Sequence, residues 1–460
     1  MEYHLYKDTL TQLPDGTCFQ QMLNERLEAK RPVKIVMVSL DDFKRINLEY
    51  GYKNGDRFIQ SVAEYLTEKC PKDCLARYNG DRFSVLFDET DDDTVKEWCY
   101  QVLKDFEAPW KVGKISHKIV PSITVIDYPK FDRDIDSMIE IIEFLYSISK
   151  SNKKVQIVYC SDEIIQKTER RIYITSVLKE IISKGKMYVN YQPILDVKAN
   201  RYKRCEALFR LTDDEIGTIS PAEFFPIAEE NGYVIEIGYV LIDKVCQYIK
   251  SFLDTGEEAP IVSVNFSRQQ LMDENLEERI LGILGKYNIR PDYLAIELPE
   301  NVFSVQYDDV KKQITKLHEK GIRFYLDGFG SGFMDLMHLI ELPFEIIKMS
   351  KNLIRASETN QTIYLLLSAM TAVFDENHMQ TLGDGIESEH LKELADLLFM
   401  NYLQGYYFSE PLSDEKMREA FLQENVTNMV DMDALLNSVD TDLNMDALTG
   451  EAISEGEVSE

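Results

Sequence analysis

The feature that most constrains this chain is an alternation, between residues 187 and 412, of short apolar runs with longer amphipathic segments. Apolar strands joined by helical crossovers are typical of a parallel α/β sheet. The runs carry a charged or amide side chain at or near their ends, at Glu206, Asn265, Glu297, Asp327, Lys348, Asp384 and Gln404. Because polar groups at the carboxyl ends of many strands mark the active face of a β/α barrel, the pattern predicts a TIM-like barrel with one functional rim.

Length and composition limit the classes of protein. A chain of 460 residues is too long for one ordinary domain, so two domains with additional segments are expected. The net charge of -29 argues against a broad electrostatic hold on nucleic acid or on an anionic membrane, although a local site can still take a nucleotide. No secretory signal and no run long enough to span a membrane is visible. The seven scattered cysteines are expected to be reduced thiols, which predicts a cytoplasmic protein.

Residues 1–160 are expected to form the first domain. A β-branched strand is predicted at 33–40, two strand-like halves flank the tight turn at Asn79-Gly80, and helices are predicted near 92–107 and 136–149. Before any comparison, this mixture predicts an α+β or α/β domain of a size that suits a nucleotide.

Three further segments complete the predicted organisation. Residues 161–186 carry an irregular apolar stripe that predicts a connecting helix, and residues 187–412 form the barrel. Residues 413–460 begin with a predicted helix and continue as an acidic stretch without Lys or Arg, which is expected to be disordered in isolation. Two copies of Met-Asp-Ala-Leu, at 432–435 and 445–448, are either docking motifs for a partner protein or an accidental repeat in a solubilising tail.

Four motifs in the first domain occur in the order of a known family. They are Asp8-x-Leu-Thr-x-Leu-Pro14, Asp42-Phe-Lys-x-Ile-Asn47, Tyr50-Gly-x-x-x-Gly-Asp56 and Arg77-Tyr-x-Gly-Asp-x-Phe83. On these motifs the domain resembles the diguanylate cyclase (GGDEF) family over nearly its whole length. The resemblance implies a guanine-nucleotide site, for GTP, at Asn47, Asp56 and Asp81.

The departures from the GGDEF pattern concern the chemistry. The fourth, acidic position of the signature pentad is Arg82, and the family's first metal-binding aspartate is Ser39. Cys70 replaces the arginine of the product-inhibition motif. A hydroxyl is a poor ligand for Mg²⁺, and two-metal phosphoryl transfer needs the carboxylates. Cyclase activity is therefore expected to be absent, with GTP binding and a purely structural role as open alternatives.

The second half of the chain resembles the EAL family of cyclic-di-GMP phosphodiesterases. The motifs that carry the resemblance begin at Tyr191-Gln-Pro-Ile194 and continue through Glu206-Ala-Leu208 and the segment 220–229 to the Tyr-Tyr-Phe-Ser-Glu-Pro-Leu of residues 406–412. Several motifs in register are specific, whereas a three-residue Glu-Ala-Leu alone would be chance. The resemblance implies a TIM-like barrel that takes cyclic di-GMP.

The residues at the strand ends suit the cleavage of a phosphodiester by water. Such a reaction needs a metal to acidify the water and cationic groups to stabilise the developing charge. Carboxylate and amide oxygens favour Mg²⁺ or Mn²⁺ over zinc, and the expected metal ligands are Glu206, Asn265, Glu297 and Asp327. The expected catalytic residues are Glu206, Lys348, Asp384 and Gln404, and the expected substrate-binding residues are Gln192, Arg210, Glu300 and Glu387. The alternative for any single one of these side chains is that it caps the helix that follows its strand.

The EAL pattern is incomplete at three positions. Gly328 follows Asp327 where the family has a second aspartate, which implies the loss of a ligand to a second metal. Asp384 stands in place of a catalytic glutamate and is one methylene shorter. Ser350 replaces the aspartate of the family's Lys-x-Asp. One metal position is therefore expected to be nearly whole and the second impoverished.

Three functional hypotheses follow. The favoured one is a cyclic di-GMP signalling protein whose barrel binds the dinucleotide as an effector with little or no turnover. The first alternative is a weakly active, metal-dependent phosphodiesterase that hydrolyses cyclic di-GMP to linear pGpG. The second is an interaction scaffold without a nucleotide, and either a homodimer or a protein partner at the acidic tail would fit any of the three.

Overall fold

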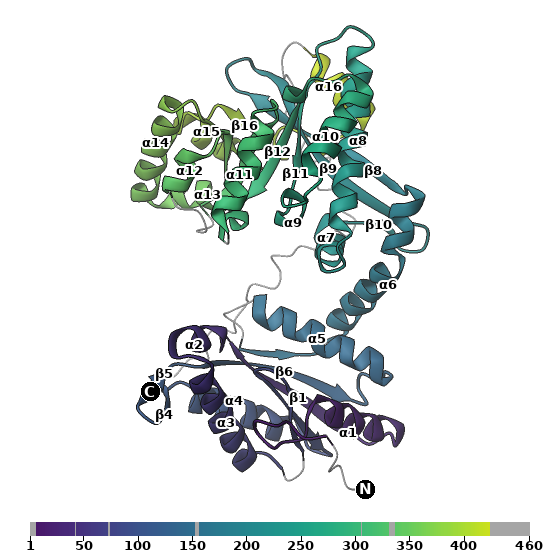
Figure 1. The fold of residues 1–460 in the computed structure, drawn as a ribbon, viewed down its shortest axis with the longest axis vertical. Coiled ribbons are helices and arrows are strands. Elements are labelled where there is room, and N and C mark those ends of the chain that lie inside the picture. Colours follow the sequence, from purple (N-terminus) through teal and green to yellow (C-terminus); the bar gives the residue numbers. More distant parts are fainter. Residues whose placement is uncertain are drawn as a thin grey trace, which may run out of the picture. The chain divides into compact units, whose positions relative to one another are not determined.

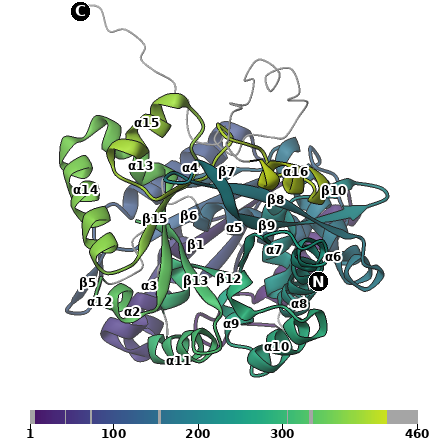
Figure 2. The same ribbon diagram turned by 90° about the horizontal axis from the view of Figure 1, so that it is seen from above.

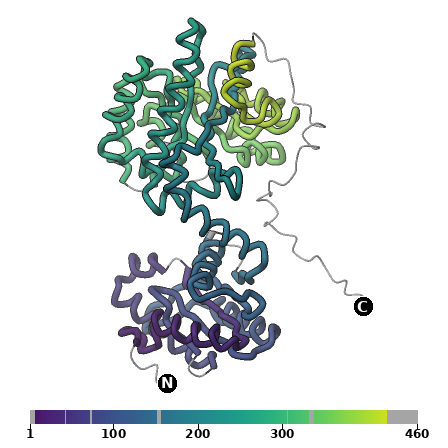
Figure 3. Tube along the Cα trace, turned by 90° about the vertical axis from the view of Figure 1, so that its right-hand side faces the viewer, coloured from purple at the N-terminus to yellow at the C-terminus, as the bar shows by residue number. Residues whose placement is uncertain are grey.

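The computed structural model describes residues 6–41, 43–71, 74–151, 156–304, 306–330 and 336–423 (Figure 1). The chain divides into two compact units, Met1–Ile174 and Thr175–Glu460. The boundary falls inside helix α6 (Asp162–Lys184), which corresponds to the predicted connecting segment. Figure 3 follows the chain from the first unit, in purple and blue, into the second, in green and yellow. Both copies of Met-Asp-Ala-Leu lie outside the described residues.

The first unit is an α+β domain built on one five-stranded sheet. The strand order is β2-β3-β1-β6-β7, and every neighbouring pair is antiparallel except β6–β7. The strands are β1 (Val33–Asp41), β2 (Leu75–Asn79), β3 (Arg82–Asp88), β6 (Val120–Tyr128) and β7 (Ile157–Tyr159). A separate hairpin is formed by β4 (Trp110–Val112) and β5 (Ile115–His117).

Helices cover both faces of this sheet. The helices are α1 (Gly16–Glu28), α2 (Phe43–Tyr50), α3 (Tyr52–Lys69), α4 (Asp92–Asp105) and α5 (Ile135–Ser151). Alternate residues of β1 face opposite sides, so Val36 and Val38 pack with α3 and α4 while Ile35 and Met37 pack with α1 and α5. The central strand is therefore apolar along nearly its whole length.

The second unit is a closed eight-stranded barrel surrounded by helices. The strands are β8 (Met187–Asp196), β9 (Arg201–Asp213), β11 (Ile261–Asn265), β12 (Leu294–Pro299), β13 (Arg323–Phe329), β14 (Phe344–Met349), β15 (Gln380–Gly383) and β16 (Tyr402–Leu403). The barrel closes because β8 pairs with both β9 and β16, and the short β10 (Gly217–Ile219) extends β9 as a hairpin. The prediction of a TIM-like barrel is confirmed.

One strand departs from the all-parallel sheet that the alternation predicted. β8 runs antiparallel to both of its neighbours. Only residues 197–200 separate β8 from β9, and a parallel connection needs a crossover of about a dozen residues or more. The short connection therefore forces a hairpin.

The helices of the second unit follow the strands along the chain and lie around the barrel. Figure 2 shows α8, α10, α11, α14 and α15 around the strands. They are α7 (Pro221–Glu230), α8 (Val234–Leu253), α9 (Arg268–Leu271), α10 (Leu276–Tyr287), α11 (Tyr307–His318), α12 (Leu336–Glu341), α13 (Lys351–Thr359), α14 (Gln361–Glu376), α15 (Glu389–Leu397) and α16 (Asp414–Leu422), with 3₁₀ turns η1 (Pro291–Tyr293) and η2 (Glu300–Ser304). No helix in the described part of the chain has the length and apolar character that crossing a bilayer requires.

Glycine at position 405 is required by a close approach between two backbone segments. Gly405 has φ +155°, and a Cβ there would lie 2.1 Å from the carbonyl oxygen and 2.4 Å from the nitrogen of Ile386. The Ile386 backbone donates to the Gln404 carbonyl at 3.0 Å and accepts from Tyr407 N–H at 3.0 Å. This contact fixes the segment that presents the Gln404 side chain.

Replacement of this glycine is expected to destabilise the barrel alone. Gly405→Ala should lower the free energy of unfolding of the second unit by about 2 kcal/mol or more, because backbone atoms cannot move away as a side chain can. Gly282→Ala in α10, where a Cβ meets nothing within 4 Å, should instead stabilise by about 0.5–1 kcal/mol. Far-UV circular dichroism during thermal unfolding measures both changes. Both tryptophans, Trp98 and Trp110, lie in the first unit, so a shift of the tryptophan-fluorescence transition would contradict the assignment.

Candidate active site

The polar side chains of the barrel form one layer above an apolar and aromatic floor. Because side chains in a strand alternate between two faces, residues two apart point the same way. The floor residues Ala295, Tyr325, Ile346, Leu382 and Tyr402 each precede a predicted site residue by two positions. The site residues therefore face inward at the carboxyl ends of the strands, which is where β/α barrels place their chemistry.

An ion-pair network around the buried Arg204 lies beside the floor residue Tyr325. Arg204, two residues before Glu206, donates from Nη2 to Glu345 Oε1 at 2.6 Å and from Nη1 to the Tyr325 hydroxyl at 2.5 Å. Arg323 donates to the other oxygen of Glu345 at 2.6 Å. Each charge in this network has a partner within it. The network therefore does not engage the site residues in the layer above.

Lys348 lies at the centre of the site. Its Nζ donates to Glu206 Oε2 and to Glu297 Oε2, both at 2.8 Å, and lies 3.8 Å from Asp327 Oδ1. The Lys348 and Glu297 side chains are almost completely buried, whereas the Asp327 side chain is 34% exposed. The arrangement is one ammonium among three carboxylates, with Asp327 at the solvent edge.

Two amide side chains complete the shell around Glu206. Asn265 Nδ2 donates to Glu206 Oε1 at 2.5 Å, and Gln404 Nε2 donates to Glu206 Oε2 at 2.7 Å. Both oxygens of Glu206 are thus engaged. Within the described residues, Glu297 Oε1 and Gln404 Oε1 are buried without a hydrogen-bond partner. These two acceptors point to a donor or cation that the protein itself does not supply.

Burial and charge separate the ionisation of the acidic groups. Burial opposes ionisation of Glu206, but the charge of Lys348 and three hydrogen bonds hold its pKa below the usual value. Burial, and then the charge of Glu206, raise the pKa of Glu297 to about 8. Burial disfavours the Lys348 ammonium, yet Glu206 and Glu297 raise its pKa. Burial also raises the pKa of Asp384, against the attraction of Lys348. Glu297 and Asp384 are the groups most ready to bind a cation or a proton.

Glu300, a predicted substrate-binding residue, bonds to the backbone at the end of β13. Its carboxylate, in η2, accepts from the Gly330 N–H at 2.9 Å. Gly330 is three residues after Asp327, so this bond joins η2 to the end of the strand that carries Asp327. Glu300 lies at the edge of the site and not among the groups around Lys348.

Two of the three positions that depart from the family pattern, 328 and 350, contribute no ligand to the Lys348 cluster. Gly328 has φ +67°, and a Cβ there would meet nothing within 4 Å, so no side chain of the described residues fills the place of the missing carboxylate. Ser350 is the N-cap of α13, and its hydroxyl accepts from Leu353 N–H. The position therefore serves the helix and not the site.

Three predicted substrate-binding residues lie outside the Lys348 cluster. Gln192 is opposite Glu206 in the β8–β9 ladder, and its Nε2 donates to the Ser409 carbonyl at 2.6 Å. Arg210 is half-buried, and its Nη1 donates to the carbonyl of the preceding residue at 2.9 Å. Glu387 is paired with Lys351 and, at 2.9 Å, with Arg355. Neither partner of Glu387 was identified from the sequence; both lie on α13.

The predicted nucleotide residues of the first unit are not joined to one another. Asn47 is half-buried in the middle of α2 and packs on Gly55, where a Cβ would lie 1.9 Å from its Oδ1. Asp56 is exposed on α3, and Asp81 lies in the turn between β2 and β3. No hydrogen bond or ion pair among the described residues links Asn47, Asp56 and Asp81.

Arg82 forms a clasp between the signature hairpin and helix α5. Its guanidinium lies over the rings of Tyr78 (5.0 Å) and Tyr146 (4.4 Å), and it bonds to Glu143 Oε2 at 2.8 Å and to Asn79 Oδ1 at 2.7 Å. A planar cation between two rings with a carboxylate partner is a strong anchor. The partners on α5 are three residues apart, a helical spacing, but the sequence offered no signal that they face Arg82.

The donor set fits a single hard divalent cation. Carboxylate and amide oxygens are provided by Glu206, Asn265, Glu297 and Asp327, and Glu297 Oε1 lacks a partner. No group of three or more His, Cys, Asp or Glu in metal-binding geometry is present among the described residues, and Lys348 donates to both Glu206 and Glu297. The type of the donor atoms, carboxylate and amide oxygen, is what fits Mg²⁺ or Mn²⁺.

Comparisons with known proteins agree on both units. The EAL domain model matches residues 176–411, and the model described as diguanylate cyclase, GGDEF domain, matches residues 5–155. Signaling protein YkoW of Bacillus subtilis is 27% identical over 426 residues, which cover 91% of this chain and 53% of YkoW. Cyclic di-GMP phosphodiesterase PdeR of Escherichia coli is 24% identical over 408 residues, covering 88% of this chain and 61% of PdeR. The chain spans about half to three-fifths of the length of these relatives.

Two solved structures have the same fold. The S helix–GGDEF–EAL portion of Vibrio cholerae LapD, bound to c-di-GMP, aligns with a TM-score of 0.62 at 16% identity over 87% of this chain and 95% of its own. The MucR phosphodiesterase in complex with c-di-GMP aligns with a TM-score of 0.51 at 24% identity over 53% of this chain and 99% of its own. The EAL match covers about half of the chain, and the GGDEF match lies in front of it, as the motifs predicted. The chain belongs to the EAL domain family and carries a GGDEF domain before its EAL domain, in the tandem GGDEF–EAL arrangement.

Proposed function

We propose that this protein is a cyclic di-GMP effector: its EAL barrel binds the dinucleotide with little or no turnover. The observation that carries the proposal is the contrast at the rim. Glu206, Asn265 and Glu297 are gathered around Lys348, whereas Gly328 leaves an open place beside Asp327. A binding protein derived from a hydrolase is expected to keep the side chains that hold the dinucleotide and to lack a carboxylate that binds a metal.

One divalent cation is the expected cofactor. Glu206, Asn265, Glu297 and Asp327 would hold Mg²⁺ or Mn²⁺, and Glu297 Oε1 would gain the partner that it lacks. When bound, such a cation lowers the pKa of a water and offsets charge on a phosphate. Lys348 would stay between the carboxylates and add a positive charge close to the phosphate, while Arg210 offers a guanidinium farther out on β9.

Weak turnover is expected from the residues at two positions, 328 and 384. A second cation would need a carboxylate at position 328, where this chain has glycine. Asp384 is one methylene shorter than the family glutamate, which displaces its oxygens by about 1.5 Å, and a misplacement of this size can reduce a rate on the order of a hundredfold. Binding depends less on this alignment, because the dinucleotide needs only to be held.

The alternative is a slow phosphodiesterase that hydrolyses cyclic di-GMP to linear pGpG. The preformed bonds of Glu206 with Asn265, Gln404 and Lys348 favour it, since they are ready to orient a water as well as a ligand. Relatives such as PdeR are named cyclic di-GMP phosphodiesterases. The two proposals differ only in product formation.

The GGDEF domain is proposed not to be a cyclase. Arg82 is engaged with Glu143 and two tyrosine rings, so the signature position holds α5 and cannot bind a metal. GTP at Asn47, Asp56 and Asp81 remains a hypothesis, which calorimetry with GTP would test. No disulfide joins any of the seven cysteines, all of them within the described residues, and this fits the proposed cytoplasmic location.

Metal and dinucleotide binding should depend on Glu206. The full chain is expected to bind one Mn²⁺ per chain and to bind cyclic di-GMP, and Glu206→Gln should weaken Mn²⁺ binding by at least about tenfold because a charged ligand is lost. Titration calorimetry and the electron paramagnetic resonance of free Mn²⁺ measure this. Glu393→Gln, an exposed carboxylate on α15, is the matched control and should change neither affinity. Equal Mn²⁺ affinity in the wild type and Glu206→Gln would contradict the site.

Turnover should increase when the missing ligand is restored. With Mn²⁺ and cyclic di-GMP, the wild type is expected to form little linear product, and Gly328→Asp combined with Asp384→Glu should raise the rate by at least about tenfold. Aspartate tolerates the positive φ of this position better than most residues. The control is Gly328→Asn with Asp384→Glu, which has the same shape without the charge. A rate that does not rise, or that rises equally in the control, would show that the missing carboxylate is not the cause.

The clasp at Arg82 should stabilise the first unit. Arg82→Met is expected to lower the unfolding free energy of that unit by about 1–2 kcal/mol, because Glu143 loses its cationic partner and the two rings lose the cation. Tryptophan fluorescence of Trp98 and Trp110 follows this transition. Arg57→Met, at an exposed position of α3, is the control. An unchanged transition in Arg82→Met would mean that the clasp is not structural.

A further inference from the structure

Helix α13 begins at the rim of the barrel and is bonded to the chain on both sides of its strand. The Ser350 N–H donates to the Phe329 carbonyl at 3.3 Å, and the Asp384 N–H donates to the Met349 carbonyl at 3.3 Å. β13 and β15, which precede these two contacts, are the neighbours of β14 in the sheet. The start of α13 therefore joins a position two residues after Asp327 to Asp384 itself.

Two side chains of α13 also lie against a glycine in each neighbouring loop. A Cβ on Gly330 would lie 2.7 Å from Leu353 Cδ2, and a Cβ on Gly385 would lie 2.8 Å from Lys351 Cβ and 2.9 Å from its Cδ. Both glycines have positive φ, +101° and +69°, which other residues rarely adopt. The methylene chain of Lys351 thus covers the backbone of the residue that directly follows Asp384.

The charged end of Lys351 binds the same loop a second time. Its Nζ donates to Glu387 Oε1, and Arg355 Nη2 donates to Glu387 Oε2 at 2.9 Å. The Lys351 and Glu387 side chains are 34% and 41% exposed, so their ion pair alone adds little to the stability of the fold. Its effect is geometric, because one side chain contacts the loop at both Gly385 and Glu387.

The loop held in this way brings a carboxyl to the Lys348 cluster. Burial raises the pKa of Asp384, the charge of Lys348 lowers it and the charge of Glu206 raises it, so the carboxyl lies close to both. The next turn of the loop supports an amide of the site, because the Ile386 N–H donates to the Gln404 carbonyl at 3.0 Å. The loop therefore carries Asp384 directly and supports the backbone of Gln404.

We infer that Lys351 is a positioning residue of the barrel: it holds residues 384–387 in the free protein, so that Asp384 and Glu387 are in place for cyclic di-GMP. The identity of the ligand rests on the proposed function, whereas the holding of the loop is a property of the free chain. Without Lys351 the ligand has to order the loop on binding, and this ordering weakens its affinity.

Amide hydrogen exchange of the full chain, without ligand, tests the holding of the loop. Lys351→Met keeps an unbranched stem over Gly385 and loses the bond to Glu387. It should raise the exchange rate in the peptide that covers residues 380–390 by at least about tenfold. Lys351→Arg can still pair with Glu387 and should bring the rate back to within about twofold of the wild type.

Titration calorimetry with cyclic di-GMP tests what the ordered loop contributes. Lys351→Met should weaken binding about fivefold, because the ligand then has to order the loop, and Lys351→Arg should bind as the wild type does. If the wild type binds no cyclic di-GMP, the proposed function fails, and hydrogen exchange alone decides whether Lys351 positions the loop.

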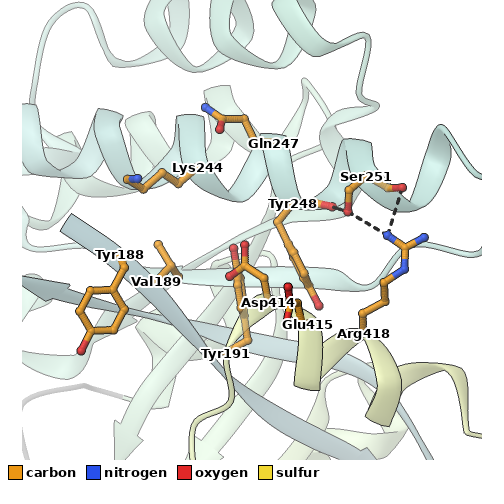
Figure 4. Close-up of a pocket in the computed structure, with 10 residues that line it drawn as sticks. All are labelled: Tyr188, Val189, Tyr191, Lys244, Gln247, Tyr248, Ser251, Asp414, Glu415 and Arg418. Atoms are coloured by element: carbon orange, nitrogen blue, oxygen red, sulfur yellow. Dashed lines mark hydrogen bonds between the residues drawn. The ribbon is translucent and has the colours of Figure 1, made fainter. Parts of the chain in front are cut away.

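Arg418 on α16 provides the matched control, because its ion pair is of the same kind and lies on the outer wall of the barrel. Figure 4 shows Arg418 at a pocket of about 390 Å³ between β8, α8 and α16, with hydrogen bonds to Ser251 of 3.3 Å. It also pairs with Glu257, and these two side chains are 27% and 31% exposed. Arg418→Met should leave the exchange of residues 380–390 and the affinity for cyclic di-GMP at their wild-type values.

The inference is overturned if Lys351→Met leaves the exchange of residues 380–390 unchanged, if Lys351→Arg does not restore it, or if Arg418→Met raises it equally. It is also overturned if the wild type binds cyclic di-GMP and Lys351→Met binds it with the same affinity.

Discussion

The contact on which the site depends is the ammonium of Lys348 between Glu206 and Glu297. Two carboxylates this close would repel each other strongly in a buried place, and the lysine makes their coexistence possible. One positive charge does not fully offset three acids, and the raised pKa of Glu297 is the result: at neutral pH this carboxyl holds a proton that a divalent cation would displace. This demand for a second positive charge, and not the total charge of the chain, selects a cation as a companion for a phosphate ligand.

The residues that replace family positions have different structural effects in the two domains. In the barrel, Gly328 lacks the carboxylate of the family pattern, and a Cβ there would meet nothing within 4 Å. In the GGDEF domain, Arg82 adds a charge and builds a contact of its own with Glu143 and the tyrosine rings. A loss beside an otherwise ordered layer is compatible with retained ligand binding, whereas a side chain that has taken on a structural role excludes the metal from its position.

The sequence predicted the barrel and the composition of its rim because both follow from local periodicity. Period two along each strand places Glu297, Lys348 and Gln404 on the inner face, and parallel strands bring their ends together. The antiparallel β8 could have been derived from the shortness of its connection to β9. The partners of Glu387 and Arg82 could not, because they come from helices whose rotation about their axes depends on the packing of the whole unit.

The floor beneath the site has its own consequence. Arg204, Tyr325 and Glu345 bond to one another and not to the residues above them. The positions at the solvent edge of the rim, Asp327 and Gly328, can therefore change without disturbing this floor, whereas the loss of Lys348 would leave buried carboxylates unpaired. In such a scaffold few substitutions separate a catalytic barrel from a binding barrel, because the strands continue to hold the remaining side chains in place.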